Sequence, residues 1–183
     1  MVNRLTFAPS ESRKFGLHFW EPVVDGRLLR QLITDVPGDE AADWVVGGDN
    51  VPVLVHSWRV GLPDDVLVLL GEKPSELANG RIPIWVCAAC GDLGCGAVTV
   101  AVEWSADTVV WRDFGWDDFN ETDLEGDIFS GSLIFDRKQY EAELRRFVDT
   151  FDEVRSSLPA ELRHDVETDP STGWRRRWKW LRR

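Results

Sequence analysis

Three apolar runs that follow one another closely along the chain place the strongest constraint on its fold. They span residues 81–87, 97–104 and 108–114, and only the turn sequence SAD separates the last two. In the middle run, Val and Trp side chains alternate with Thr, Ala and Glu, which is the period of two expected of a half-buried antiparallel strand. The sequence therefore predicts a meander of three antiparallel strands.

A second pattern predicts one long amphipathic helix after a short strand at 132–136. Asp136 and Gln139 form a capping pair at the start of this helix. An apolar stripe follows at spacings of three and four residues, with charged side chains off the stripe. The stripe consists of Tyr140, Leu144, Phe147, Val148, Phe151, Val154 and Leu158. We expect this C-terminal helix to pack on one face of the sheet.

Shorter patterns complete the expected fold. They predict strands at 14–20, 51–58 and 65–70, a helix at 25–36 capped by Asp25, and a single helical turn at 73–80. Because the strands do not alternate regularly with helices, the fold class is α+β with a mainly antiparallel β-sheet. Residues 1–160 are predicted to form a single α+β domain, and residues 161–183 a C-terminal extension.

The formal charge of −11 is unevenly distributed along the chain. The last ten residues, WRRRWKWLRR, hold six of the 21 basic residues and no acidic one, which leaves residues 1–173 with 15 basic against 32 acidic side chains. An acidic body of this kind repels nucleic-acid backbones and attracts cationic proteins or ligands. We therefore expect a protein partner with a basic surface, and no nucleic acid on the acidic body.

The sequence also bears on the cellular compartment. No uncharged apolar stretch reaches the length of a transmembrane helix, and MVNRLTFAPSESRKF lacks the apolar core of a signal peptide. We thus expect a cytoplasmic protein without a transmembrane segment. In a reducing compartment, an odd number of clustered cysteines is typical of metal ligands or free thiols rather than of disulfides.

All three cysteines of the chain lie within nine positions, in the connection between the predicted strands at 81–87 and 97–104. If these two strands form a hairpin, the sulfurs of Cys87, Cys90 and Cys95 converge on one point. Cys-x-x-Cys followed by Gly is a sequence that wraps a chain around a tetrahedral ion, because Gly permits positive φ after the turn. The pattern predicts a cysteine knuckle that holds a structural zinc ion.

Zinc takes a fourth ligand in structural sites, and the sequence has neither a second Cys-x-x-Cys nor a closely spaced pair of histidines to supply it. The candidates are His56, His18, His164 and Asp92. We select His56, which ends an apolar strand run, against the alternative that a single histidine there is a hydrogen-bonded core residue.

Other interpretations of the cysteines are open. Cys87 and Cys90 form a Cys-x-x-Cys redox pair, but in thioredoxin-like proteins this motif begins a helix, whereas here it leads into a strand. An open fourth position occupied by water would make the metal catalytic. The three cysteines are also compatible with ordinary packing on a Gly-rich turn.

At these motifs the chain resembles a family of uncharacterised bacterial proteins. The resemblance rests on LVHSW, DDVLVLLGE, WVCAACGDLGCGAVTV, TVVWRDFGW and FDRKQYEAELRR, and it covers residues 3 to about 150. Members are sometimes labelled oxidoreductase, but no established activity, cofactor or catalytic residue supports that label. The resemblance therefore implies no function.

A strip of aromatic and acidic side chains in WRDFGWDDFN is a candidate partner-binding surface. It comprises Trp111, Asp113, Trp116, Asp117 and Asp118. Aromatic anchors surrounded by acids suit a basic partner or a cationic ligand. The alternative is a strand end whose aromatic residues belong to the core and whose acids are solvated.

The basic tail is a second candidate surface. Trp174, Trp178 and Leu181 would line one face of a helix, with six basic side chains around it. We expect the tail to bind acidic surface, of this chain or of a neighbouring copy, so that a homo-oligomer can form through it. An anionic membrane, a nucleic acid or a frayed end are the alternatives.

The sequence as a whole is interpreted as that of an acidic cytoplasmic binding protein, similar in kind to immunity or inhibitor proteins, with a three-cysteine knuckle that holds zinc. The alternative is an enzyme that uses the cysteine cluster for thiol redox or metal-assisted chemistry.

Overall fold

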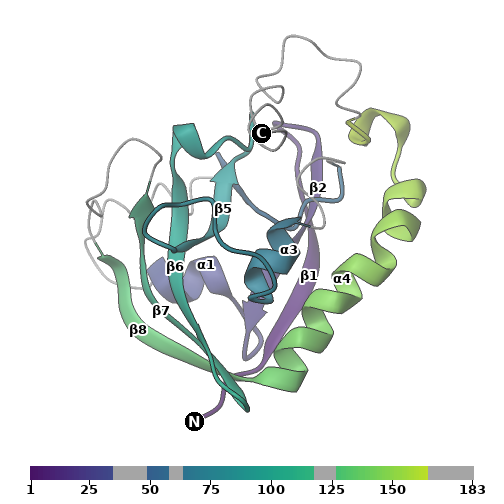
Figure 1. Cartoon of the computed structure of the whole chain (residues 1–183). Coiled ribbons are helices and arrows are strands. Elements are labelled where there is room, and N and C mark those ends of the chain that lie inside the picture. Colours follow the sequence, from purple (N-terminus) through teal and green to yellow (C-terminus); the bar gives the residue numbers. More distant parts are fainter. Residues whose placement is uncertain (35–48, 58–63, 118–126, 165–183) are drawn as a thin grey trace.

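The computed structural model describes residues 1–34, 49–57, 64–117 and 127–164, which form two antiparallel sheets (Figure 1). The strand orders are β1-β2-β3 and β4-β5-β6-β7-β8. The strands are β1 (Leu5–Ser12), β2 (Leu17–Val24), β3 (Arg27–Leu28), β4 (Asn50–Pro52), β5 (Ile82–Cys87), β6 (Ala97–Trp104), β7 (Thr108–Asp117) and β8 (Asp127–Asp136). The helices are α1 (Leu29–Thr34), α3 (Asp64–Leu69) and α4 (Arg137–Ser157), with 3₁₀ turns η1 (Leu93–Cys95) and η2 (Ala160–Leu162).

Backbone hydrogen bonds join the two sheets at both edges. After β4, the amide of Val53 donates to a carbonyl of β5 (3.0 Å), and the carbonyl of Leu54 accepts from the amide of Trp20 in β2 (2.9 Å). At the other edge, Asn3 forms a bridge to Phe135 of β8 just before β1 begins. The two sheets therefore enclose one hydrophobic core.

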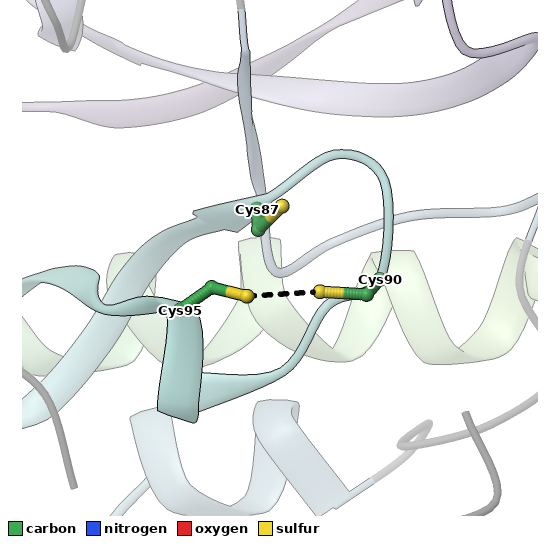
Figure 2. Close-up of side chains that lie close together, drawn as sticks. All are labelled: Cys87, Cys90 and Cys95. Atoms are coloured by element: carbon green, nitrogen blue, oxygen red, sulfur yellow. Dashed lines mark hydrogen bonds between the residues drawn. The ribbon is translucent and has the colours of Figure 1, made fainter. Parts of the chain in front are cut away.

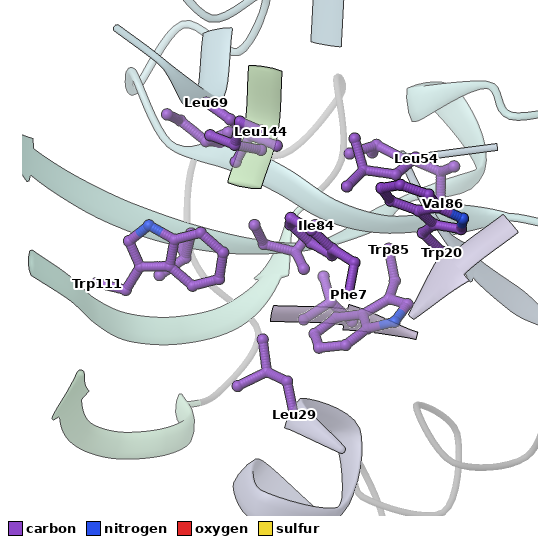
Figure 3. Close-up of a cluster of buried hydrophobic side chains, with 14 of the residues drawn as sticks. Phe7, Trp20, Leu29, Leu54, Leu69, Ile84, Trp85, Val86, Trp111 and Leu144 are labelled. Carbon is purple, nitrogen blue, oxygen red and sulfur yellow. The ribbon is translucent and has the colours of Figure 1, made fainter. Parts of the chain in front are cut away.

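Large aromatic side chains fill the space between the sheets (Figure 3). The Trp111 indole donates to the Tyr140 hydroxyl (3.3 Å), which in turn donates to the Leu69 carbonyl (2.8 Å). The Trp85 indole donates to the Glu21 carboxylate (3.3 Å). Each of these aromatic residues thus contributes its apolar area to the core without the cost of an unpaired polar atom.

The predicted meander and the long helix are confirmed, and with them an α+β fold with mainly antiparallel sheets. β5, β6 and β7 pair in sequence order. The Asp136 carboxylate accepts from the amide of Gln139 (2.9 Å), as expected of a capping pair. Tyr140, Leu144 and Phe147 of the predicted stripe are fully buried. Helix α4 contacts β1, β7, β8 and α3, so it packs against strands of both sheets.

Helix α4 is the only helix longer than six residues in the described part of the chain. Its surface is strongly charged, with acidic and basic side chains on the exposed face. None of the described helices combines the length and the apolar character that crossing a membrane requires.

The strand predicted at 65–70 is wrong, because helix α3 occupies this segment. Val66, Leu69 and Leu70 are buried, and their spacing of three and four residues places them on one face of a helix. The carbonyl of Leu69 at the end of the helix accepts from the Trp104 indole (3.3 Å) and from the Tyr140 hydroxyl (2.8 Å). These tertiary contacts outweigh the strand propensity of the apolar run.

The helix predicted at 25–36 is also placed wrongly, since α1 begins only at Leu29 and Asp25 is not its cap. Asp25 lies in the turn between β2 and β3 with a φ of 51°. Its carboxylate accepts from the side chain of Asn3 (2.7 Å) and the amide of Arg4 (2.8 Å). The acidic side chain therefore stabilises a hairpin rather than a helix terminus.

The remaining differences concern strand limits and one turn. Strand β1 was not predicted, because polar residues and a proline occupy its second half. The strand predicted at 14–20 corresponds to β2, and the one predicted at 51–58 corresponds to the shorter β4. The strands predicted at 108–114 and 132–136 are longer in the structure, as β7 and β8. Residues 73–80 form a non-helical turn. Strand β6 is also not half-buried throughout: residues 97–100 are buried on both faces, and Glu103 and Trp104 are exposed beyond a register shift.

The burial of helix α4 generates a stability prediction. Leu144→Ala should lower the free energy of unfolding by about 2–5 kcal/mol, because the fully buried side chain leaves a cavity. Val148→Ala, one turn later on the same helix, should cost less than about 1 kcal/mol, since Val148 is 38% exposed. Urea unfolding followed by tryptophan fluorescence measures both. Equal losses would contradict the placement of the helix.

Candidate metal centre

The three cysteines lie in the connection between β5 and β6 (Figure 2). Strand β5 ends at Cys87, whose carbonyl accepts from the amide of Gly91 (2.7 Å) and so closes a tight turn that carries Cys90. The turn η1 follows directly: the Asp92 carboxylate caps it by accepting from the amide two residues later (2.8 Å), and Cys95 is its last residue. Two successive turns therefore bring the cysteines back toward one another.

Glycines permit this path. Gly91 and Gly96 have φ values of 60° and 85°, in the region that side chains with a Cβ rarely adopt. A Cβ at Gly96 would also overlap the indole of Trp116 on β7. Trp116, a predicted partner-binding residue, is thus half-buried against the cysteine loop.

The sulfur atoms are close enough to share one ion. All three Sγ atoms lie within 4.8 Å of one another, and those of Cys90 and Cys95 are 3.4 Å apart. Sulfurs that bind one tetrahedral zinc ion through bonds of about 2.3 Å stand about 3.8 Å apart. Within the described ranges, this is the only group of three such ligand atoms. The predicted convergence of the three cysteines is confirmed.

The five-stranded sheet holds one side of this cluster. Cys87 pairs with the buried Asn50 of β4, and the amide of Ala88 donates to the carbonyl of Asp49 (2.9 Å). Cys87 and Cys90 are half-buried, whereas Cys95 is exposed. The cluster therefore has a fixed inner side and a solvent-accessible outer side.

Burial keeps the Cys90 thiol protonated in the absence of a metal. The loss of water raises the pKa of this thiol to about 12; the backbone amide of Asp92 opposes the shift, and the neighbouring thiols of Cys95 and Cys87 add to it. A thiol activated as a nucleophile needs a lowered pKa, and the shift at Cys90 has the opposite direction. A metal cation, in contrast, displaces the proton when it binds. The electrostatics favour a metal ligand over a nucleophile.

None of the four candidates for a fourth ligand completes the cluster. Within the described residues, the group at metal-binding distance contains only the cysteines. The Asp92 carboxylate caps η1. The rings of His18 and His56 contact each other, and the amide of His164 binds the carbonyl of Ser57 next to them. The geometry therefore does not support the choice of His56 as the fourth ligand.

His56 is instead a fully buried aromatic residue of the core. Its ring centroid lies 4.4 Å from that of Phe147 and 5.2 Å from that of Trp20, and it stacks on Phe151 at an interplanar angle of 12°. Neither ring nitrogen has a hydrogen-bond partner among the described residues. Burial, assisted by the nearby His18, lowers the pKa of the His56 ring to about 3, so the ring is neutral at physiological pH.

All three histidines of the chain surround Ser57. The amide of His18 donates to the Ser57 hydroxyl (2.7 Å), and the amide of His164 donates to the Ser57 carbonyl (2.9 Å). The buried guanidinium of Arg155 donates to the carbonyl of His56 (2.8 Å) and to that of Ser57. Through these hydrogen bonds, the charged side chain of Arg155 joins the end of α4 to the segment that connects the two sheets.

Sequence reasoning missed Arg155, although its position carried a signal. Arg155 follows Phe147 and Phe151 at intervals of four residues, so it occupies the buried stripe of the helix. A charged residue at such a position needs polar partners inside the protein. The carbonyl oxygens of His56, Ser57 and His164 supply them here.

The predicted aromatic and acidic strip is largely part of the protein body. Trp111 is 1% exposed and packs in the core, and Asp117 is 6% exposed with the Nε of Arg81 at 3.9 Å. Asp113 is half-buried and forms an ion pair with Arg112. Trp111 and Asp117 therefore present no free surface to a partner, because β7 continues through the strip as a strand. The predicted partner residues Asp118, Trp174 and Trp178 lie outside the described residues.

Comparisons with family models, with curated proteins and with solved structures give no match to the chain. Membership of the bacterial family therefore stays a prediction. The case for a function rests on the geometry and the electrostatics of the site.

The buried imidazole generates a prediction about pH. The unfolded His56 ring binds a proton near pH 6.5 and the folded ring only near pH 3, so the unfolded state holds more protons between these values. Stability should fall as the pH decreases through this window, with a His56 contribution that approaches about 1.4 kcal/mol per pH unit. Urea unfolding at several pH values measures the slope.

His56→Phe should reduce this slope, because it keeps an aromatic ring and removes the titrating group. The exposed Val148 provides the control, and Val148→Ala, which removes no titrating group, should keep the wild-type slope. An unchanged slope in His56→Phe would show that the imidazole is not held neutral by burial.

Proposed function

We propose that this protein binds one thiophilic metal ion, with zinc(II) as the first candidate, through Cys87, Cys90 and Cys95. One observation carries the proposal: three cysteine sulfurs lie within 4.8 Å of one another. Thiolates are the commonest ligands of structural zinc, and the sulfur spacing suits an ion of that size. The raised pKa of the Cys90 thiol supports the same conclusion, because a cation relieves the cost of a buried thiolate.

The proposed role of the ion is to fix the connection between β5 and β6. Cys87 ends one strand and Cys95 lies two residues before the next, so one ion bound to both cross-links the base of the hairpin. The free energy of metal binding would then add to the free energy of folding. Water or a group outside the cluster would supply the fourth ligand.

We further propose that the metal-stabilised body binds a cationic protein, in the manner of immunity or inhibitor proteins, in a reducing compartment such as the cytoplasm. The net charge of −11 supports this, since it attracts basic partners over long range. Asp149, Asp152 and Glu153 extend the acidic character to the exposed surface of α4. A reducing compartment would keep the three thiols available to the metal.

The metal site predicts a binding stoichiometry and a gain in stability. Protein purified without chelator should contain about one zinc ion per chain, and at a free zinc concentration of 100 Kd the gain should be about 2.7 kcal/mol. The affinity should rise with pH, because the ion competes with the thiol protons. Cobalt(II) substitution, read from the thiolate-to-metal charge-transfer absorption, and thermal unfolding with and without zinc measure these effects.

Matched variants identify the ligands. Cys87→Ser and Cys90→Ser should lose both the metal and the gain in stability, whereas Asp92→Asn, which keeps a capping oxygen, should retain both. His56→Phe should also retain the metal, because the ring lies outside the cluster. Metal-free wild type with three titratable thiols and no response to zinc would refute the proposal.

A further inference from the structure

Two of the three clustered cysteines are placed to react with each other. The Sγ atoms of Cys90 and Cys95 are 3.4 Å apart, and Figure 2 shows them pointing toward one another across the loop. Cys95 is exposed and Cys90 is half-buried. Cys87 differs from both, because it belongs to strand β5 and pairs with Asn50 of β4.

We propose that Cys90 and Cys95 form a reversible disulfide when a peroxide oxidises the protein, and that this bond expels the metal ion. The control of metal occupancy rests on the metal site proposed above. The pair differs from the one that the Cys-x-x-Cys motif suggests, Cys87 with Cys90. The sequence spacing favours the nearer cysteine, whereas in the fold the sulfur of the more distant Cys95 lies 3.4 Å from that of Cys90, and Cys87 is held in strand β5.

Oxidation of the two thiols by one hydrogen peroxide takes place in two steps. The exposed sulfur of Cys95 attacks one oxygen of hydrogen peroxide, which breaks the O–O bond, forms a sulfenic acid and releases one water. The Cys90 thiol, 3.4 Å away, then passes its proton to the departing hydroxide as its sulfur attacks the sulfenic sulfur, so that proximity rather than a populated thiolate drives the step, an S–S bond forms and a second water leaves. In sum, two thiols are oxidised, one peroxide is reduced to two waters, and a dithiol reductant reverses the change by becoming a disulfide itself.

The loop geometry explains why this bond would open the metal site. Both sulfurs of the bond are ligands in the proposed site, so its formation leaves Cys87 as the only thiolate. A single thiolate cannot hold zinc against solvent or chelators. Gly91, Gly94 and Gly96 lie between or beside the paired cysteines, which gives the backbone freedom to bring the sulfurs from 3.4 Å to the bond length of about 2.0 Å.

The position of Asp92 allows a direct test. No lysine or arginine lies between Arg81 and Arg112, so trypsin leaves all three cysteines in one peptide. Cleavage before aspartate separates residues 65–91, with Cys87 and Cys90, from residues 92–106, with Cys95. After peroxide treatment and alkylation of free thiols, mass spectrometry should show these two peptides joined, with Cys87 alkylated.

Single variants then assign the partner of Cys95. Cys87→Ser should form the joined peptides to the wild-type extent, and Cys95→Ser should form none. Cys90→Ser should instead accumulate a Cys95 sulfenic acid, which dimedone traps. Joined peptides in Cys90→Ser, or a bond confined to the first peptide in wild type, would overturn the assigned pair.

Zinc release, followed with a chromogenic chelator, separates this inference from the metal proposal. Zinc-loaded wild type should release its ion as the joined peptides appear, and a dithiol reductant should restore binding. A protein that binds zinc and retains it through peroxide treatment, without joined peptides, would overturn the inference and leave the metal site standing. A protein that forms the joined peptides but never binds zinc would refute the metal site and, with it, the control of occupancy.

Discussion

The antiparallel pairing of β5 with β6 is the constraint on which the rest of the structure depends. Val86 pairs with Ala97, and this register fixes how far apart the two ends of the connecting loop can lie. It brings Cys87 and Cys95 together at the end of the hairpin, although eight positions separate them in the sequence. The same pairing buries Trp85 in the core, so that the packing which stabilises the fold also positions the candidate metal site.

Much of this arrangement could be predicted from local patterns, because the meander, the capping pair of α4 and the cysteine loop each depend on residues close in sequence. The three sulfurs converge because two adjacent strands form a hairpin. The errors arose where distant contacts decide the outcome. The apolar run at 65–70 suits a strand or a helix equally, and hydrogen bonds from Trp104 and Tyr140 to the end of α3 belong to the tertiary structure. The surroundings of His56 could not be predicted for the same reason, since only the packing of α4 shows that its ring lies among aromatic side chains.

The cysteine loop combines two chemical properties that compete for the same atoms. A metal ion stabilises three thiolates, whereas oxidation removes two of them as a disulfide. The half-buried position of Cys90 favours the cation, because its neutral thiol is a poor nucleophile and its thiolate needs a counter-charge. The exposure of Cys95 provides access for an oxidant. The net charge of −11 is a third property, since an acidic protein attracts cations over long range.

The central claim is that the sulfurs of all three cysteines bind one ion. Zinc-edge X-ray absorption on the zinc-loaded full chain tests it most directly, because the first shell reports both the type and the number of ligand atoms. The account predicts three sulfur scatterers at about 2.3 Å and one lighter atom. Replacement of one sulfur by a lighter atom is expected in Cys95→Ser if that variant still holds zinc. A first shell made only of nitrogen and oxygen, or a spectrum unchanged by the loss of Cys95, would contradict it.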